Sequence, residues 1–190
     1  MKQFNETEYN SYWSAILKLI DYNENLTGII EKFSLPEKLK NCAGALEEES
    51  GVAYPGGLVK HILGTIMYAK GIAGILSKHF SNYESLYKVL LLMHISKNEM
   101  FMKNPDEYQV NKFGRNYIFS ETEGKLKAGV RSIVWCANNG ISLTPTEAEA
   151  MIVLDREQSQ GVGQYSRYES LLATIVRQAN ELAFSIEKTK

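Results

Sequence analysis

The chain has 190 residues, of which 44% are hydrophobic and 23% charged, and its formal net charge is −1. This length is typical of a single domain that buries its own core, and the composition is that of an ordinary globular protein. A net charge this close to zero provides no overall field that would attract nucleic acid or an anionic membrane. The composition therefore gives no indication that the protein binds nucleic acid or a membrane through its overall charge.

The cysteines and the apolar runs set further limits. Cys42 and Cys136 are too few and too far apart in sequence for a disulfide framework, so we expect free thiols in a reducing compartment. No pattern of a secretory signal opens the chain, and the longest uninterrupted apolar run, 89–93, is too short to cross a bilayer. We therefore expect a cytoplasmic protein without a membrane partner.

The first half of the chain has the apolar spacing of helices. We expect helices at 6–20, 23–33 and 36–48, a tight turn at 51–57, a long helix at 57–78 and a buried helix at 82–96. Pro55 fixes one φ angle in the turn, and the glycines beside it allow backbone angles that other residues avoid, so the next helix is aimed accurately. Gly64 and Gly71 lie inside that helix, which indicates either close helix packing or room for a ligand.

The second half of the chain begins with a segment that lacks the apolar spacing of a helix. Short β-prone pieces at 100–102 and 117–119, separated by turn signals, predict a small hairpin or an ordered loop within 98–120. Helices are predicted at 125–138, 144–157 and 167–187, with a loop at 158–164 and with a capping box from Thr144 to Glu147.

These patterns predict a mainly α fold, a helical bundle with a small β-hairpin inserted near 98–120. Residues 1–34 would form an N-terminal helical extension that packs on a core domain of residues 35–190.

Two of the three histidines are placed in predicted buried helices. These are His61, just after the Gly-Gly turn, and His94, whereas His79 lies near a helix end and is expected to be exposed. A single core histidine is more often a hydrogen-bonded structural residue than a ligand. Two histidines on separate central helices favour a shared site.

The surroundings of both histidines resemble a known family. Ala53-Tyr-Pro-Gly-Gly-Leu-Val-Lys-His61 resembles the opening motif of the His-Asp (HD) superfamily of metal-dependent phosphohydrolases, and most closely the small HD proteins of phages and prophages. Leu91-Leu-Met-His94-Ile95-Ser-Lys97 is similar to the second motif, L-L-H-D-x-x-K, and Ala179-Asn180-Glu-Leu-Ala183 to the third, A-D-x-x-A. The resemblance covers about residues 35–187 and implies an HD-like helical domain.

In that family two imidazoles and two carboxylates hold a divalent metal, which polarises a phosphoryl group. His61 and His94 match the two histidines, but Ile95 and Asn180 stand where the family has aspartates. An isoleucine cannot bind a metal, and an amide offers one neutral oxygen, so we expect metal binding to be lost or severely weakened.

Other positions match family functions less directly. Further metal ligands of the family align with Ala128 and Asp155, of which Asp155 could ligate. The motif lysine is retained as Lys97, and with Arg131 or Arg177 it would hold a phosphate; alternatively, Lys97 is a solvated residue at a helix end.

From this resemblance we expect a non-catalytic, phage-encoded HD-fold protein without a cofactor, which acts as a binding or structural module in the host cytoplasm or in the virion. Its partner would be another protein or a second copy, bound through the N-terminal helix or the 98–120 hairpin. One alternative is a phosphohydrolase for a nucleotide or phosphoester, with Mn, Fe, Ni, Zn or Mg held by His61, His94, Asn180 and Asp155 and with Lys97 and Asp155 in catalysis. Another is a metal-free nucleotide sensor or sponge.

Overall fold

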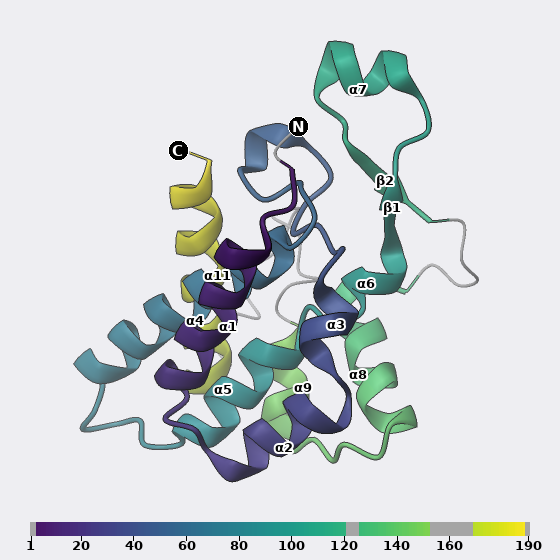
Figure 1. Ribbon diagram of the computed structural model, residues 1–190. Coiled ribbons are helices and arrows are strands. Elements are labelled where there is room, and N and C mark those ends of the chain that lie inside the picture. Colours follow the sequence, from purple (N-terminus) through teal and green to yellow (C-terminus); the bar gives the residue numbers. More distant parts are fainter. Residues whose placement is uncertain (1–2, 121–125, 153–168, 189–190) are drawn as a thin grey trace.

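The computed structural model describes residues 3–120, 126–152 and 169–188, and the fold is mainly helical with one small antiparallel hairpin, as the sequence predicted (Figure 1). The described helices are α1 (Glu6–Leu19), α2 (Glu24–Lys32), α3 (Leu35–Leu39), the short 3-10 helix η1 (Glu48–Ser50), α4 (Gly57–Ile75), α5 (Tyr83–Leu92), α6 (Lys97–Met100), α7 (Glu107–Phe113), α8 (Ala128–Asn138), α9 (Pro145–Ile152) and α11 (Leu171–Glu187). The strands are β1 (Phe101–Lys103) and β2 (Tyr117–Phe119).

The core is organised around α4, which packs against α1 and α11 and also contacts α5. Leu58, Ile62 and Ile66 of α4 are fully buried in the main hydrophobic cluster. The second half of α5 is buried on all sides, as its uninterrupted apolar run indicates. Burial of these faces against one another is the main stabilising contribution in such a bundle.

The N-terminal helix belongs to the same core. Tyr9, Trp13 and Ile16 of α1 are buried in the cluster that also contains the first turns of α4. The Tyr9 hydroxyl donates a hydrogen bond to the carbonyl of Pro36. The aromatic face of α1 is therefore used inside the chain.

Several predicted helices are shorter than expected, and those expected at 125–138 and 167–187 begin only at Ala128 and Leu171. The helix at 36–48 ends at Leu39, because the chain then loops back and Gly44 N donates to Val52 O over 2.9 Å. A Cβ on Gly44 would lie only 2.9 Å from Cγ2 of Val52, so glycine permits this close approach. The long helix ends at Ile75, short of residue 78.

The helix predicted at 82–96 ends at Leu92, and residues 93–96 form a turn. Ser132 of α8 explains this early end: its hydroxyl donates to Met93 O over 2.9 Å and lies 3.3 Å from Ser96 N. These contacts offer the backbone an alternative to further helical bonds.

The hairpin lies where it was predicted, but it is more elaborate. β1 pairs with β2 with Met102 opposite Ile118, and the connection contains α7, which the sequence analysis took for turns only. The Asp106 side chain caps α7 by accepting from Tyr108 N over 3.0 Å, and Gly114 ends it with a φ of 62°. This arm projects from the helical body (Figure 1).

Several local predictions are confirmed. Thr144 and Glu147 form the capping box, with Thr144 N donating to Glu147 Oε2 over 2.8 Å and Glu147 N donating to Thr144 Oγ1 over 3.2 Å. His79 is exposed. No helix among the described residues is long and apolar enough to cross a bilayer. The predicted loop at 158–164 and the end of the helix at 144–157 lie outside the described residues.

Candidate functional site

The turn at 51–57 aims α4, and with it His61, at the C-terminal part of α11. Gly51 and Gly56 have φ angles of 71° and 82°, which glycine adopts without strain. A Cβ on Gly51 would lie 2.2 Å from the Glu187 carbonyl oxygen, so the turn approaches the end of α11 more closely than other residues allow. His61 is consequently fully buried beside α11.

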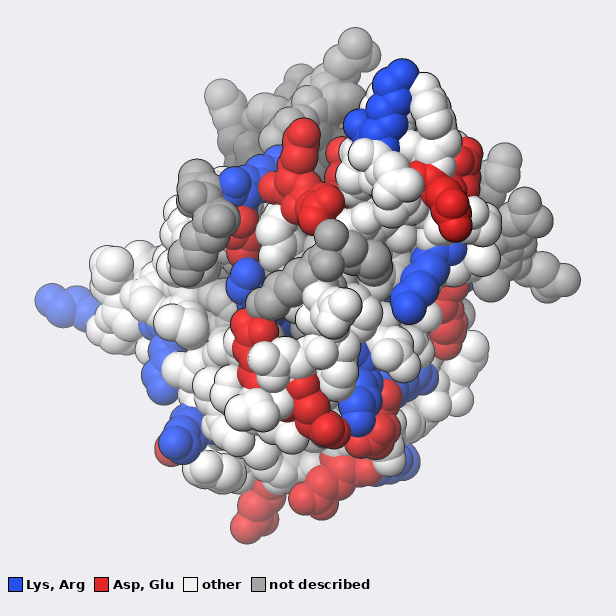
Figure 2. Space-filling view, turned by 45° about the horizontal axis from the view of Figure 1, so that its top comes forward, with Lys and Arg blue, Asp and Glu red and all other residues white. Residues whose placement is uncertain are grey.

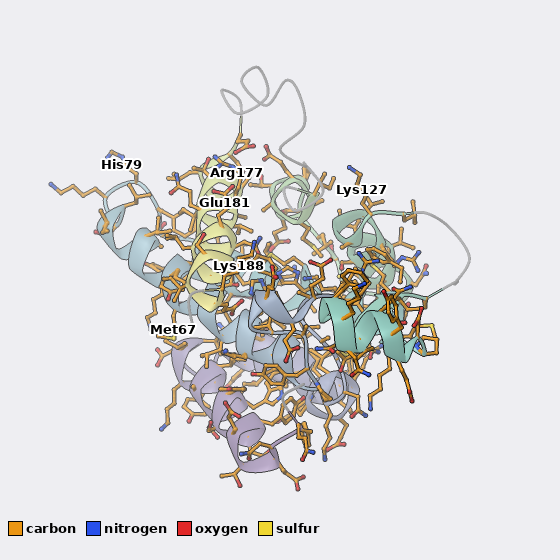
Figure 3. The ribbon with its side chains drawn as sticks, turned by 90° about the horizontal axis from the view of Figure 1, so that it is seen from above. Met67, His79, Lys127, Arg177, Glu181 and Lys188 are labelled. Atoms are coloured by element: carbon orange, nitrogen blue, oxygen red, sulfur yellow. The ribbon has the colours of Figure 1, made fainter. Side chains whose placement is uncertain are left out.

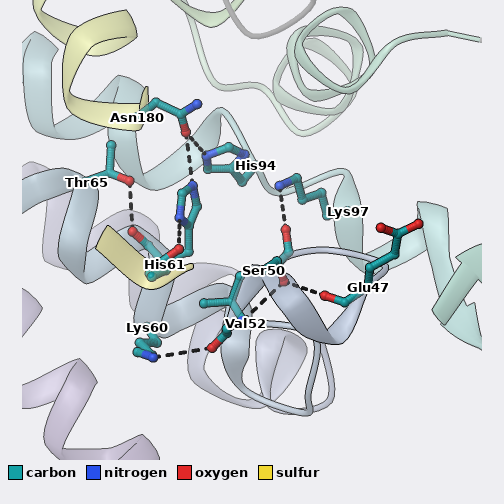
Figure 4. A network of polar contacts seen from close by, with 12 residues as sticks. Glu47, Ser50, Val52, Lys60, His61, Thr65, His94, Lys97 and Asn180 are labelled. Carbon is teal, nitrogen blue, oxygen red and sulfur yellow. Dashed lines mark hydrogen bonds and ion pairs between the residues drawn. The ribbon is translucent and has the colours of Figure 1, made fainter. Parts of the chain in front are cut away.

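The two motif histidines and Asn180 meet at one point. Nε2 of His61 lies 3.0 Å from Asn180 Oδ1, and Nε2 of His94 lies 3.2 Å from the same oxygen (Figure 4). The two imidazole centroids are 4.9 Å apart. The structure thus brings together residues from α4, from the turn after α5 and from α11, all of which the sequence analysis singled out.

Sequence reasoning missed a fourth member, Glu187. Its Oε2 lies 2.9 Å from Nδ1 of His61, and it is buried although charged. The available signal was its position seven residues after Asn180, which places both on one face of a helix. A Cβ on Gly64 would lie 3.6 Å from Glu187 Oε1, an ordinary van der Waals distance, so the packing there does not require glycine; a Cβ on Gly71 would meet no atom within 4 Å.

The hydrogen-bond partners constrain the protons on His61. A carboxylate and an amide oxygen are both acceptors, so an imidazole between them donates from both nitrogens and carries a positive charge. If the Asn180 amide is turned, its NH₂ group donates to both Nε2 atoms instead, and a neutral His61 donates to Glu187 through Nδ1. In both arrangements each nitrogen of His61 has a partner.

His94 is less completely satisfied. Its Nδ1 is buried and has no hydrogen-bond partner among the described residues. Burial lowers the pKa of His94 well below its ordinary value, and the nearby Lys97 and His61 lower it further. Burial therefore favours the neutral form of His94.

The donors at this point do not match the metal site of the resembled family. Ile95 is 1% exposed and packs in the hydrophobic core. Asp155 lies outside the described residues. Within the described ranges, no group of three or more histidine, cysteine or acidic side chains is placed to hold a metal. Two imidazoles and one amide oxygen fall short of two imidazoles and two carboxylates.

Lys97 lies close to these residues and is buried, so it is not the solvated helix-end residue that the sequence also allowed. Its Nζ donates to Gly44 O over 2.8 Å (Figure 4). Burial lowers the pKa of Lys97 to about 8, and the Glu187 carboxylate partly opposes this.

A cleft of about 730 Å³ opens beside Lys97 and Asn180, between the segment 44–50 and one face of α11. Arg177, proposed from sequence as a phosphate ligand, instead contacts Glu169 at 3.3 Å and Glu181 at 3.6 Å. Neither Arg177 nor Arg131 of α8 lines the cleft. Of the three candidate phosphate ligands, Lys97 is the one at the cleft.

Charge on the molecular surface is mixed. Among the described residues on the face shown in Figure 2, acidic and basic side chains are interspersed, without a continuous patch of either sign.

Comparison with known protein families, with curated proteins and with solved structures finds no match for this chain.

Proposed function

We propose that the chain is a non-catalytic domain of the HD type, a binding module in which the Asn180 amide links the two motif histidines at the place where the resembled family holds a metal. The observation that carries this proposal is the convergence of both Nε2 atoms on Asn180 Oδ1, at 3.0 and 3.2 Å. An amide between two imidazoles gives both Nε2 atoms a hydrogen-bond partner without any ion.

The chemistry of the substituted positions supports the same view. A metal site of this kind requires anionic ligands to offset the charge of the dication. Ile95 offers an apolar side chain in the core, and Asn180 is neutral. Glu187 is directed at Nδ1 of His61, where it stabilises the imidazole.

Metal content of the purified full chain tests the proposal. After incubation with Mn²⁺, Fe²⁺, Ni²⁺ or Zn²⁺ and gel filtration, we expect far less than one metal per chain. Asn180→Asp restores one carboxylate between the histidines, so we expect it to bind these ions more tightly by at least about tenfold. His79→Ala is a matched control, because it removes an exposed histidine outside the cluster.

Stoichiometric metal in the unaltered chain that disappears in His61→Ala would overturn the proposal. It would favour the alternative, a metal-dependent phosphohydrolase. One observation favours that alternative: a carboxylate behind Nδ1 of a histidine, like Glu187 behind His61, is the usual outer partner of a metal-bound imidazole. Release of phosphate from nucleotides or phosphodiesters, dependent on Mn²⁺ and on His61, would establish it.

A further inference from the structure

The cleft beside the histidine cluster has the size of a small-molecule site. Its inner part contains Lys97, Phe101, Asn180 and Phe184, and its rim carries Glu47, Glu49, Glu181 and Lys188. Glu181 and Lys188 lie along the same exposed face of α11 (Figure 3). Each end of the cleft thus offers a different chemistry.

The inner part offers hydrogen-bond donors. Lys97 is 9% exposed, and among the described residues its Nζ donates a hydrogen bond to one acceptor, Gly44 O. An ammonium group has three hydrogens, so two remain for a ligand. Where Asn180 Oδ1 is engaged by the two imidazoles, its NH₂ group is the part of the side chain left to donate.

The same lysine is held in an apolar surrounding. Its Nζ lies 5.3 Å from the ring centroid of Phe184 and 5.8 Å from that of Phe101. In the described part of the chain no carboxylate forms an ion pair with Lys97, and the buried Glu187 carboxylate nearby compensates its charge only in part. A desolvated cation of this kind lowers stability unless an anion compensates it, which points to an anionic ligand.

The rim decides which kind of anion fits. Three carboxylates and two ammonium groups line the cleft, and two of the carboxylates, Glu47 and Glu181, also contact arginines outside it, Arg115 and Arg177, each at 3.6 Å. No arginine lines the cleft to form bidentate bonds with a phosphate dianion. A ligand with one carboxylate and one ammonium group matches donors inside and acceptors at the rim.

We propose that this cleft binds a small zwitterion of the amino-acid class, with its carboxylate on Lys97 and Asn180 and its ammonium group toward the carboxylates of the rim. This deepens the proposed binding function by naming the ligand class. The histidine cluster lies behind one wall of the site, since Phe184 lines the cleft and its ring packs on His61 at a tilt of 34°, with centroids 4.0 Å apart.

The test is a thermal-shift screen of the full chain against the proteinogenic amino acids, followed by calorimetric titration of the best one. Inorganic phosphate and nucleoside monophosphates are screened in parallel. We expect at least one amino acid to raise the melting temperature. Its amide, which lacks the carboxylate, and its deaminated acid, which lacks the ammonium group, should each bind at least about tenfold more weakly.

Two variants locate the site. Lys97→Met should weaken amino-acid binding by more than about tenfold, and Glu181→Gln by a smaller factor, because its carboxylate is at the solvated rim. Lys70→Met is the matched control, since Lys70 also donates to a backbone carbonyl, that of Leu19 at 3.2 Å, but lies outside the cleft.

Three results would overturn the proposal: no amino acid binds, binding survives Lys97→Met unchanged, or phosphate and nucleotides bind at Lys97 in place of amino acids. The last result would identify a nucleotide-binding module. All three leave the metal-content measurement unaffected, so failure of this inference is distinguishable from failure of the proposed function.

Discussion

Lys88 and Lys97 both donate to backbone carbonyl groups at the margin of the core, yet their surroundings differ. Lys88 Nζ lies 2.6 Å from Ser142 O and 3.1 Å from Glu147 Oε2. Glu147 also accepts from Thr144 N, so this ion pair joins α5 to the capping box of α9. Lys97 lies beside aromatic rings at an open cleft.

The difference separates a structural lysine from a candidate binding lysine. In a buried ion pair with additional hydrogen bonds, each charge is compensated within the chain. Removing one partner leaves the other as an uncompensated buried charge, which lowers stability. A buried lysine without such a partner is a source of instability in the free protein. An anionic ligand that compensates such a lysine would stabilise the folded protein.

Lys88→Met is expected to have the largest effect. It leaves the Glu147 carboxylate, whose side chain is 4% exposed, without its counter-ion, and should lower the free energy of unfolding by about 3 kcal/mol. Urea denaturation measures this. Lys88→Met combined with Glu147→Gln, which keeps the capping box, should recover part of the loss. A loss below about 1 kcal/mol in the single variant would mean that the pair contributes little.

Lys97→Met is expected to act in the opposite direction. A pKa near 8 in the folded protein means that folding disfavours the charged form, and methionine occupies similar space without charge. The unpaired Gly44 carbonyl offsets part of the gain, so we expect an increase of about 1–2 kcal/mol near neutral pH. Lys97→Arg keeps the charge and should not show this increase. Destabilisation by Lys97→Met would contradict the contrast with Lys88.

The pH dependence of stability provides a third comparison. Because the pKa of Lys97 is lowered on folding, the unfolded chain binds more protons above pH 8, and this residue's contribution to stability rises from about pH 8 toward its ordinary pKa near 10.5. Burial raises the pKa of Tyr9, Tyr117 and Cys42, which opposes this rise. The difference between the unaltered chain and Lys97→Met isolates the lysine. That difference should shrink as pH increases, and a constant difference would exclude this explanation.

The smallest expected effect concerns Glu147 at acid pH. Its burial alone would raise the pKa of the carboxyl, but the hydrogen bond from Thr144 and the charge of Lys88 lower it overall. Its contribution to stability is present above the ordinary pKa of a glutamate and is lost as pH falls below it. Between neutral and acid pH, Glu147→Gln should therefore lose less stability than the unaltered chain loses. Circular dichroism of acid unfolding measures both losses, and equal losses would contradict this explanation.

Much of the fold could be predicted because local patterns dominate it. The apolar spacing of α1, α4 and α11, the capping box of α9 and the turn glycines are each set by residues close in sequence. The early end of α5 could not be predicted from local patterns, because it depends on Ser132, a residue from a different helix. The helix inside the hairpin was missed because Asp106 and Gly114, which cap it, are equally typical of turns.

The candidate site divides in the same way. The resemblance to the HD motifs pointed to His61, His94 and Asn180, and the structure brings their side chains to one point. Glu187 was missed because it belongs to no motif, and Arg177, expected at Lys97, is instead paired with Glu169 and Glu181, which only packing determines.

By itself the sequence determined a mainly α chain in which a Pro-Gly-Gly turn opens a long apolar helix that carries His61, because hydrophobic periodicity and turn chemistry act over a few residues. Only the tertiary structure decided that an amide stands between the two imidazoles, that Glu187 supports one of them and that Lys97 is buried at an open cleft. These depend on which helix faces approach each other, and that outcome results from packing the whole core.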